Sequence, residues 1–250
     1  MQLLPAKLVG NVGLSEIVGL RMGYQPYMRD LPDADYAALQ NADESNRTAE
    51  TLKRVTDTII ASVALIFLLP VLLPIALLVR LSDGGPAIFR QKRIGRNGQE
   101  FYCLKFRSMH VEAEQQLKRL LERDPEARAE WKATQKLEND PRITRLGNFL
   151  RKTSLDELPQ LINIIKGDMS IVGPRPIVRN EIEKYGEYFD HYSSVRPGLT
   201  GLWQVSGRSE TTYDERVALD VEYVQDRTYL KDLKIMAMTV PAVLTSDGAK

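Results

Sequence analysis

The chain contains little cysteine and little histidine. Its 250 residues include one cysteine, Cys103, and two histidines, His110 and His191. A single cysteine cannot close an internal disulfide, so cysteine usage gives no support to an oxidising compartment. One cysteine and two separated histidines also do not make a structural zinc pattern. We expect Cys103 to be a small buried residue and each histidine to serve packing or solubility rather than catalysis.

Several other signatures are missing. Residues 1–10 lack the basic stretch, apolar run and small-residue cleavage site of a signal peptide. The sequence has no P-loop, no dinucleotide-binding fingerprint and no internal repeat. Hydrophobic residues make up 43% of the chain and charged residues 27%, which argues against wholesale disorder.

Net charge is also small, at +1, but the charge is unevenly spread. Residues 90–107 carry six basic side chains against one acidic side chain. This local excess indicates an anionic partner, although a solvated basic loop explains it equally well. A nucleic-acid-binding domain is the weaker reading because no binding motif is present, so we expect no nucleic acid partner.

What the sequence does have is one long apolar run. Residues 58–79 contain no charge, and a helix needs about 20 such residues to cross the hydrocarbon core of a bilayer. The alternative is a buried core helix of a soluble protein, but such helices normally carry a polar stripe, and this run has none. Pro70 and Pro74 stand near its middle, where each removes a backbone donor.

Basic residues flank both ends of this run. Lys53 and Arg54 precede it, and Arg80 and Arg90 follow it. Because positive charge prefers the cytoplasmic side, flanks of this kind fit a helix that enters and leaves on one face. We therefore predict a re-entrant membrane hairpin over residues 51–80, a helix-break-helix that is broken at the two prolines.

The rest of the chain predicts an α+β fold that is mostly helical. Residues 81–110 read as strands and turns, with Asn97-Gly98 as a hairpin signal. Residues 111–138 read as helix with a break at Asp124-Pro125, and residues 148–166, 214–227 and 229–245 as further helices. We assign residues 1–50 to an N-terminal extension of unclear role and residues 81–250 to a compact cytoplasmic catalytic domain. Its last helix packs in the core or lies in the membrane interface.

The strongest candidates for chemistry are two adjacent carboxylates, Asp156 and Glu157. Ser154 and Glu157 match a capping box, in which the serine caps a helix and the glutamate bonds back. Alternatively Pro159 begins the helix and both acids lie just before it. In either register the acids sit at a helix N-terminus, where anions are stabilised.

Three further segments carry cations. Prolines on both sides fix the backbone at Arg175, which suits a phosphate ligand but also a stiff loop. Lys105 and Arg107 are two residues apart in a predicted strand, so their side chains lie on the same face of it. The glycine-rich segment 196–208 contains Trp203, which stacks on a ligand or is simply buried.

Together these segments resemble the bacterial polyprenyl-phosphate sugar-1-phosphate transferases, also called monotopic phosphoglycosyl transferases. The resemblance covers residues 51–250 and depends on many motifs in one order. They are GPAIF (85–89), KFRSM (105–109), DPRIT (140–144), LRKTSLDELPQ (150–160), KGDMS (166–170), VGPRP (172–176) and RPGLTGLWQVSGR (196–208). The chain is most similar to the undecaprenyl-phosphate galactose phosphotransferases, through residues 202–208 and the long segment 111–138.

The resemblance implies a function and a set of site residues. Asp156 is expected to attack a UDP-sugar, release UMP and hold the sugar phosphate until undecaprenyl phosphate accepts it. Asp156 and Glu157 are expected to place Mg²⁺. The substrate and phosphate ligands implied are Arg151, Arg175, Lys105, Arg107, Gln204 and Arg208. By the same analogy we expect the protein to bind membrane lipids and to lie on the cytoplasmic face of a bacterial inner membrane. We also expect it to act in exopolysaccharide or O-antigen synthesis and to form a homodimer.

Two departures and two alternatives stay open. Small members of the family break the hairpin at Ser-Pro, whereas this chain has Leu69-Pro70, and large members carry long N-terminal domains where this chain has 50 residues. UDP-glucose is an alternative donor. A non-catalytic membrane scaffold for polysaccharide assembly is an alternative function, in which Ser154 and Glu157 only cap and the basic segments bind lipid head groups.

Overall fold

The structure of the protein, a computed structural model, describes residues 33–134, 137–206 and 211–244. The contacts divide the chain into two units, Met1–Val55 and Thr56–Lys250. The predicted N-terminal extension lies mostly outside the described residues. The features below belong to the second unit, into which the long helix α2 continues.

The described residues form an α+β fold that is mostly helical, as the sequence predicts. The strands are β1 (Ile88–Ile94), β2 (Glu100–Phe106), β3 (Ser170–Val172) and β4 (Gly198–Thr200). The principal helices are α2 (Asp33–Asp83), α3 (Ala113–Arg123), α4 (Pro125–Thr134), α5 (Arg145–Lys152), α6 (Gln160–Lys166), α7 (Ile182–Tyr185), α8 (Phe189–Ser194), α9 (Leu202–Ser206), α10 (Tyr213–Gln225) and α11 (Tyr229–Leu244). A short 3-10 turn, η4 (Leu155–Glu157), separates α5 from α6.

Two small sheets organise the domain. β1 and β2 pair antiparallel, with Ile94 opposite Glu100, and β3 pairs with β4 in parallel. The hairpin between β1 and β2 turns where Asn97 has a φ of 58° and Gly98 a φ of 70°. Asparagine and glycine accept this left-handed conformation most readily, so the predicted Asn97-Gly98 hairpin is confirmed. The predicted break at Asp124-Pro125 is also confirmed, because α3 ends at Arg123 and α4 begins at Pro125.

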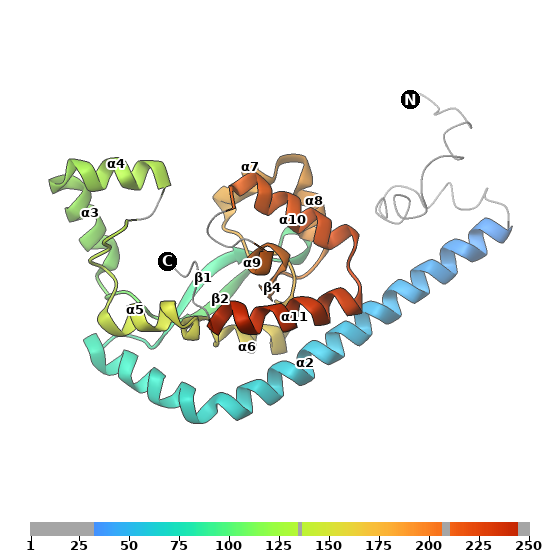
Figure 1. Ribbon diagram of the computed structural model, residues 1–250, viewed down its shortest axis with the longest axis horizontal. Coiled ribbons are helices and arrows are strands. Elements are labelled where there is room, and N and C mark those ends of the chain that lie inside the picture. Colours follow the sequence, from blue (N-terminus) through green and yellow to red (C-terminus); the bar gives the residue numbers. More distant parts are fainter. Residues whose placement is uncertain (1–32, 135–136, 207–210, 245–250) are drawn as a thin grey trace. The chain divides into compact units, whose positions relative to one another are not determined.

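Helix α2 differs from the expected helix-break-helix. It remains helical through Pro70 and Pro74, and it bends instead of breaking (Figure 1). Each proline removes one hydrogen bond to the carbonyl four residues earlier and crowds that carbonyl. Because the two prolines are themselves four residues apart, both losses fall on one side of the helix and bend it in one direction. The part Arg47–Asp83 is long and apolar enough to cross a membrane, judged by length and composition.

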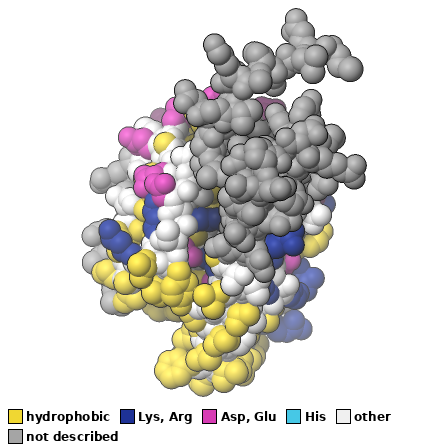
Figure 2. Space-filling model, turned by 90° about the vertical axis from the view of Figure 1, so that its right-hand side faces the viewer, with side chains coloured by type: hydrophobic (Ala, Val, Ile, Leu, Met, Phe, Trp, Pro, Cys, Tyr) yellow, Lys and Arg dark blue, Asp and Glu magenta, His cyan; other side chains and the backbone are white. Residues whose placement is uncertain are grey.

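One face of α2 packs against the domain, and the other is exposed and apolar. Ala61, Leu72 and Val79 lie on the packed face and are buried. Ile66 is 69% exposed and Phe67 80%. Figure 2 shows apolar side chains gathered at the lower end of the molecule, at the level of the bend of α2 in Figure 1. A core helix of a soluble protein would bury most of this surface, so the core-helix reading loses its support.

The core joins the helices to both sheets. One buried cluster brings together residues of α6, β3, α10 and α11, namely Leu161, Ile164, Val172, Tyr223 and Ile235. The Ser170 hydroxyl donates to Asp57 Oδ2 at 2.6 Å, so a buried hydrogen bond ties α2 to β3. On α11, Ile235 is buried while Leu230 is 76% exposed, so this helix packs on one face and presents apolar residues on another.

Candidate active site

The two carboxylates stand in the short turn between α5 and α6. Ser154, which precedes η4, has φ 55° and ψ 14°, a left-handed conformation that is uncommon for serine. In the described part of the chain, no side-chain capping bond forms at Ser154. The capping-box prediction is therefore wrong. The second register fits better, because Pro159 directly precedes α6 and both acids lie before it.

This turn lies on the packed face of α2. Leu155 and Leu158, on either side of the two acids, pack against the cluster that contains Leu72, Ile75 and Val79. The acids are therefore held next to the part of α2 that contains the proline bend. The opposite, exposed face of the same helix is apolar.

Asp156 is 8% exposed. Burial raises the pKa of its carboxyl to about 6, against an opposing effect of the nearby Lys105 ammonium. Burial also acts to raise the pKa of Glu157, but the nearby cations, Lys105 first and then Arg175 and Arg93, together hold that pKa below its ordinary value. Lys105 has the strongest effect of the three because it is in direct contact, with its Nζ 2.6 Å from Glu157 Oε1. The two neighbouring acids are thus shifted in opposite directions, as at many sites that carry out proton or group transfer.

A pocket that is partly open to solvent lies beside these groups, and its volume of about 270 Å³ includes open solvent. Four of its lining side chains carry a formal charge: Lys105, Glu157, Arg93 and Arg175. Three are cations and one is an anion. The remaining lining residues are Cys103, Gln160, Pro176, Gly198, Leu199 and Gln204. A pocket with this charge excess favours an anionic ligand.

Arg175 is exposed and makes no ion pair with any described residue. Its guanidinium lies 5.9 Å from the centre of the Trp203 ring, and Arg216 lies 4.8 Å from the same ring. Trp203 is 8% exposed. Of the two readings of Trp203, the structure thus favours burial over ligand stacking, while Arg175 keeps its hydrogen-bond donors for an anion.

The other predicted ligands do not all line the pocket, and Arg151 is absent from its lining. Gln204 lines it. Arg151 donates from Nε to Ser108 Oγ at 2.8 Å, and Asp156 is its strongest charged neighbour. Arg107 is not among the lining residues, because its guanidinium bonds Asp83 and the Val79 carbonyl.

Arg208 lies outside the described residues. Pro70 and Pro74, predicted as the hairpin break, form the bend of α2.

Two residues that the sequence did not single out help to build the site. Arg93 lines the pocket from β1, and the sequence showed it only as one of six basic residues. Asn163, 1% exposed, accepts from Leu104 N at 3.0 Å and donates to the Tyr102 carbonyl at 2.8 Å. These bonds fasten β2, which carries Lys105, to α6. The contacts span about 60 positions, so no local pattern announces them.

The carboxylates suit a hard cation only together with a ligand. Among the described residues, no group of three or more Asp, Glu, His or Cys side chains could hold a metal. Asp156 and the Oε2 atom of Glu157 remain as donors, because Lys105 takes Glu157 Oε1. Mg²⁺ is commonly bound by one or two carboxylates, water and substrate phosphates, so this donor pair fits Mg²⁺ that arrives with a diphosphate.

Comparison with known proteins gives a consistent result. The family model described as "Bacterial sugar transferase" matches residues 48–246. The chain is 50% identical to an undecaprenyl-phosphate galactose phosphotransferase of Salmonella typhimurium over 82% of its own length and 43% of the relative. It is 51% identical to the exopolysaccharide production protein ExoY of Rhizobium meliloti, over 79% of the chain and 87% of the relative. It is 44% identical to a UDP-glucose:undecaprenyl-phosphate glucose-1-phosphate transferase of Escherichia coli, over 76% of the chain and 39% of the relative.

The extent of these matches differs between relatives. The chain spans less than half the length of several of the curated relatives that it matches. The match covers the apolar helix, the carboxylate turn and the pocket, since all of these lie between residues 48 and 246.

Proposed function

The chain belongs to the bacterial sugar transferase family, and on this premise we propose that it transfers a sugar 1-phosphate from a UDP-sugar to undecaprenyl phosphate. The observation that carries the proposal is the position of Asp156. Asp156 is buried and does not itself line the cation-rich pocket, but Glu157 next to it does, and the turn that carries both acids packs on the apolar helix. We propose that a soluble diphosphate reaches Asp156 from the side of the pocket and that the lipid reaches it from the side of the apolar helix.

In the first step, an oxygen of Asp156 attacks the β-phosphorus of the UDP-sugar. The bond from that phosphorus to the oxygen that bridges the two phosphates breaks, and UMP leaves with this oxygen. The sugar phosphate remains on Asp156 as an acyl phosphate. A carboxyl with a pKa of about 6 is mainly ionised at neutral pH, as a nucleophile must be.

The cations of the site bind and orient the diphosphate. Arg175 forms no ion pair with any described residue, although its charge helps to lower the pKa of Glu157, and its backbone is fixed by prolines on both sides. Lys105 holds Glu157 and lies close enough to Asp156 to affect its pKa. Gln204 and Arg151 are the further ligands that we propose; the same role for Arg107 and Arg208 remains a prediction from the sequence.

Asp156 and Glu157 are the residues that would hold Mg²⁺. When bound, the ion neutralises charge on the diphosphate and on the leaving phosphate. The protein's own side chains set the direction of attack, because they fix the diphosphate against Asp156.

In the second step, an oxygen of undecaprenyl phosphate attacks the same phosphorus. The bond to Asp156 breaks, the carboxylate is restored, and undecaprenyl-diphosphate-sugar is released. For this step the polyprenyl chain must lie in a membrane. We propose that the exposed apolar face of α2 and the apolar side chains of α11 occupy the cytoplasmic leaflet of a bacterial inner membrane. The bend at Pro70 and Pro74 would return α2 to the face that it entered, which makes α2 re-entrant.

The proposed sugar is galactose, because two relatives at 47–50% identity are named for galactose transfer. Glucose is the alternative, since other relatives are named for glucose. We further propose a role in starting exopolysaccharide or O-antigen assembly and a homodimeric state, both by analogy with the family.

The test is release of UMP from purified full-length protein in detergent micelles, with Mg²⁺ and undecaprenyl phosphate. We expect UMP with UDP-galactose, less UMP with UDP-glucose, and the matching lipid product. UMP from UDP-glucose alone would keep the reaction class and change the sugar. Salt-sensitive lipid binding without UMP from either donor would refute catalysis and support the scaffold alternative.

A further inference from the structure

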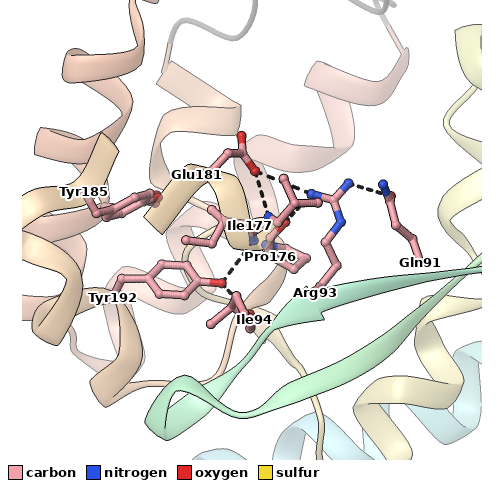
Figure 3. A network of polar contacts seen from close by, with 10 residues as sticks. Gln91, Arg93, Ile94, Pro176, Ile177, Glu181, Tyr185 and Tyr192 are labelled. Carbon is pink, nitrogen blue, oxygen red and sulfur yellow. Dashed lines mark hydrogen bonds and ion pairs between the residues drawn. The ribbon is translucent and has the colours of Figure 1, made fainter. Parts of the chain in front are cut away.

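Arg93 is a partly buried arginine that lines the pocket, and one of its hydrogen bonds goes to the loop that carries Arg175. Its side chain is 12% exposed. Arg93 Nη1 donates to the Pro176 carbonyl at 2.9 Å, and Nη2 donates to Gln91 Oε1 at 2.7 Å (Figure 3). Glu181 lies 3.8 Å away, an ion pair without hydrogen-bond geometry. The carbonyl that Arg93 holds belongs to the residue directly after Arg175.

Strand β1 fastens the same loop at a second point. Ile94 N donates to the Ile177 carbonyl at 2.9 Å. Tyr192 bridges both residues, because its hydroxyl donates to the Ile94 carbonyl at 2.6 Å and accepts from Ile177 N at 3.1 Å. Figure 3 shows Arg93 and Tyr192 on opposite sides of this junction. The backbone after Arg175 is thus held by two elements that are far apart in sequence, β1 and α8.

The charges of Arg93 and Arg175 also act together. Burial, and next to it the Arg175 guanidinium, lower the pKa of Arg93. The charged side chains that line the pocket are three cations and Glu157, which leaves an excess of two positive charges. The diphosphate of a nucleotide sugar carries two negative charges, so it would relieve the repulsion between the two arginines.

We propose that Arg93 is a positioning residue for the diphosphate: it bonds the Pro176 carbonyl, holds Arg175 in the pocket, and adds its own charge behind Arg175. The inference depends on the proposed function, because it places the diphosphate of the UDP-sugar in this pocket. It goes further by assigning to β1 a part in substrate binding. An arginine suits this role because its planar fork holds a carbonyl and a glutamine oxygen at once.

The test uses full-length protein in detergent micelles and UDP as the probe, because UDP contains the diphosphate but no sugar to transfer. Titration calorimetry compares wild type with Arg93→Gln, Arg93→Lys and the control Arg90→Gln. Arg90 lies on the same strand but is exposed and absent from the pocket lining. We expect Arg93→Gln to bind UDP about tenfold more weakly, Arg93→Lys to recover part of the loss, and Arg90→Gln to stay within about twofold of wild type.

A double-mutant cycle with Arg175→Gln tests whether Arg93 acts through Arg175. If it does, the combined loss is well below the product of the two single losses. In turnover kinetics the Arg93→Gln variant should show a raised KM for the UDP-sugar and a kcat within about threefold of wild type. A kcat that falls while KM and UDP affinity stay unchanged would indicate a merely structural role and overturn the inference.

Two outcomes separate this inference from the proposed function. A wild-type chain that neither binds UDP nor releases UMP refutes the function itself. A wild-type chain that does both, beside an Arg93→Gln variant with equal UDP affinity, refutes only the role of Arg93. If Arg93→Gln does not fold, Arg93→Lys decides alone: it keeps the charge but loses the fork, so wild-type affinity in this variant contradicts the inference.

Discussion

Replacing Asp156 by asparagine should make the protein more stable while it abolishes transfer. In the folded, metal-free chain burial raises the pKa of Asp156 to about 6, whereas an unfolded aspartate titrates near 3.8. At pH 7 the carboxyl is ionised in both states, and the folded state bears the cost of a buried charge. A pKa difference of about two corresponds to roughly 3 kcal/mol. Asparagine has nearly the same shape and no charge, so Asp156→Asn should recover most of this amount.

The direction in which stability changes with pH provides a second check. A carboxyl whose pKa is higher in the folded state binds its proton more tightly there, so wild type gains stability as pH falls through about 6. Between pH 7 and pH 5 that gain should be about 1.3 kcal/mol. The stability advantage of Asp156→Asn should therefore shrink from roughly 3 to about 1.6 kcal/mol.

The assay is denaturant unfolding of the full chain in detergent micelles with EDTA, at both pH values. An exposed acid on α8, Asp190, supplies the control: Asp190→Asn should change stability by less than about 0.5 kcal/mol at either pH. An Asp156→Asn protein that is less stable than wild type at pH 7, or an advantage that does not depend on pH, would refute the argument that burial dominates this carboxyl.

Arg107→Met should lower the free energy of unfolding by about 3 kcal/mol, because it leaves the partly buried Asp83 carboxylate without its cation. Unchanged stability together with a raised KM for the UDP-sugar would instead support the phosphate-binding role that the sequence predicts. Ser154→Val should lower the free energy of unfolding by roughly 1–2 kcal/mol, because a β-branched residue resists the left-handed conformation. Ser154→Gly should not destabilise the protein, and equal melting temperatures for the two variants would contradict this prediction. Gly147→Ala should destabilise by about 1–3 kcal/mol, because a methyl group there overlaps the Ser108 carbonyl, and thermal unfolding without a shift would show that α5 can move away.

The parts of the fold that depend on local sequence could be predicted. The hairpin follows from Asn97-Gly98, and the separation of α3 from α4 from Asp124-Pro125, because the left-handed region and proline restrict the backbone at those residues themselves. The length of the uncharged apolar run was enough to predict a long apolar helix at α2. Its shape was not predictable, because a proline in a helix can cause a bend or a break, and packing against the domain decides between them.

The site was predicted less completely, for a similar reason. The order of the motifs indicated the family and the two carboxylates. The partner of Glu157 was not visible, because Lys105 lies 52 positions away, and Ser154-x-x-Glu157 suggested a local bond instead. Arg93 and Pro176 are 83 positions apart. Contacts of this kind arise from tertiary packing, which a single sequence does not encode in any short pattern.

The most direct test of the central claim, that Asp156 is the nucleophile, is mass spectrometry of the protein after incubation with Mg²⁺ and UDP-galactose in the absence of lipid. We predict a covalent hexose phosphate, mapped to Asp156 in a proteolytic peptide, together with UMP release and loss of the adduct when undecaprenyl phosphate is added. Asp156→Asn should carry no adduct. Sustained transfer by Asp156→Asn, or an adduct on another residue, would contradict the account.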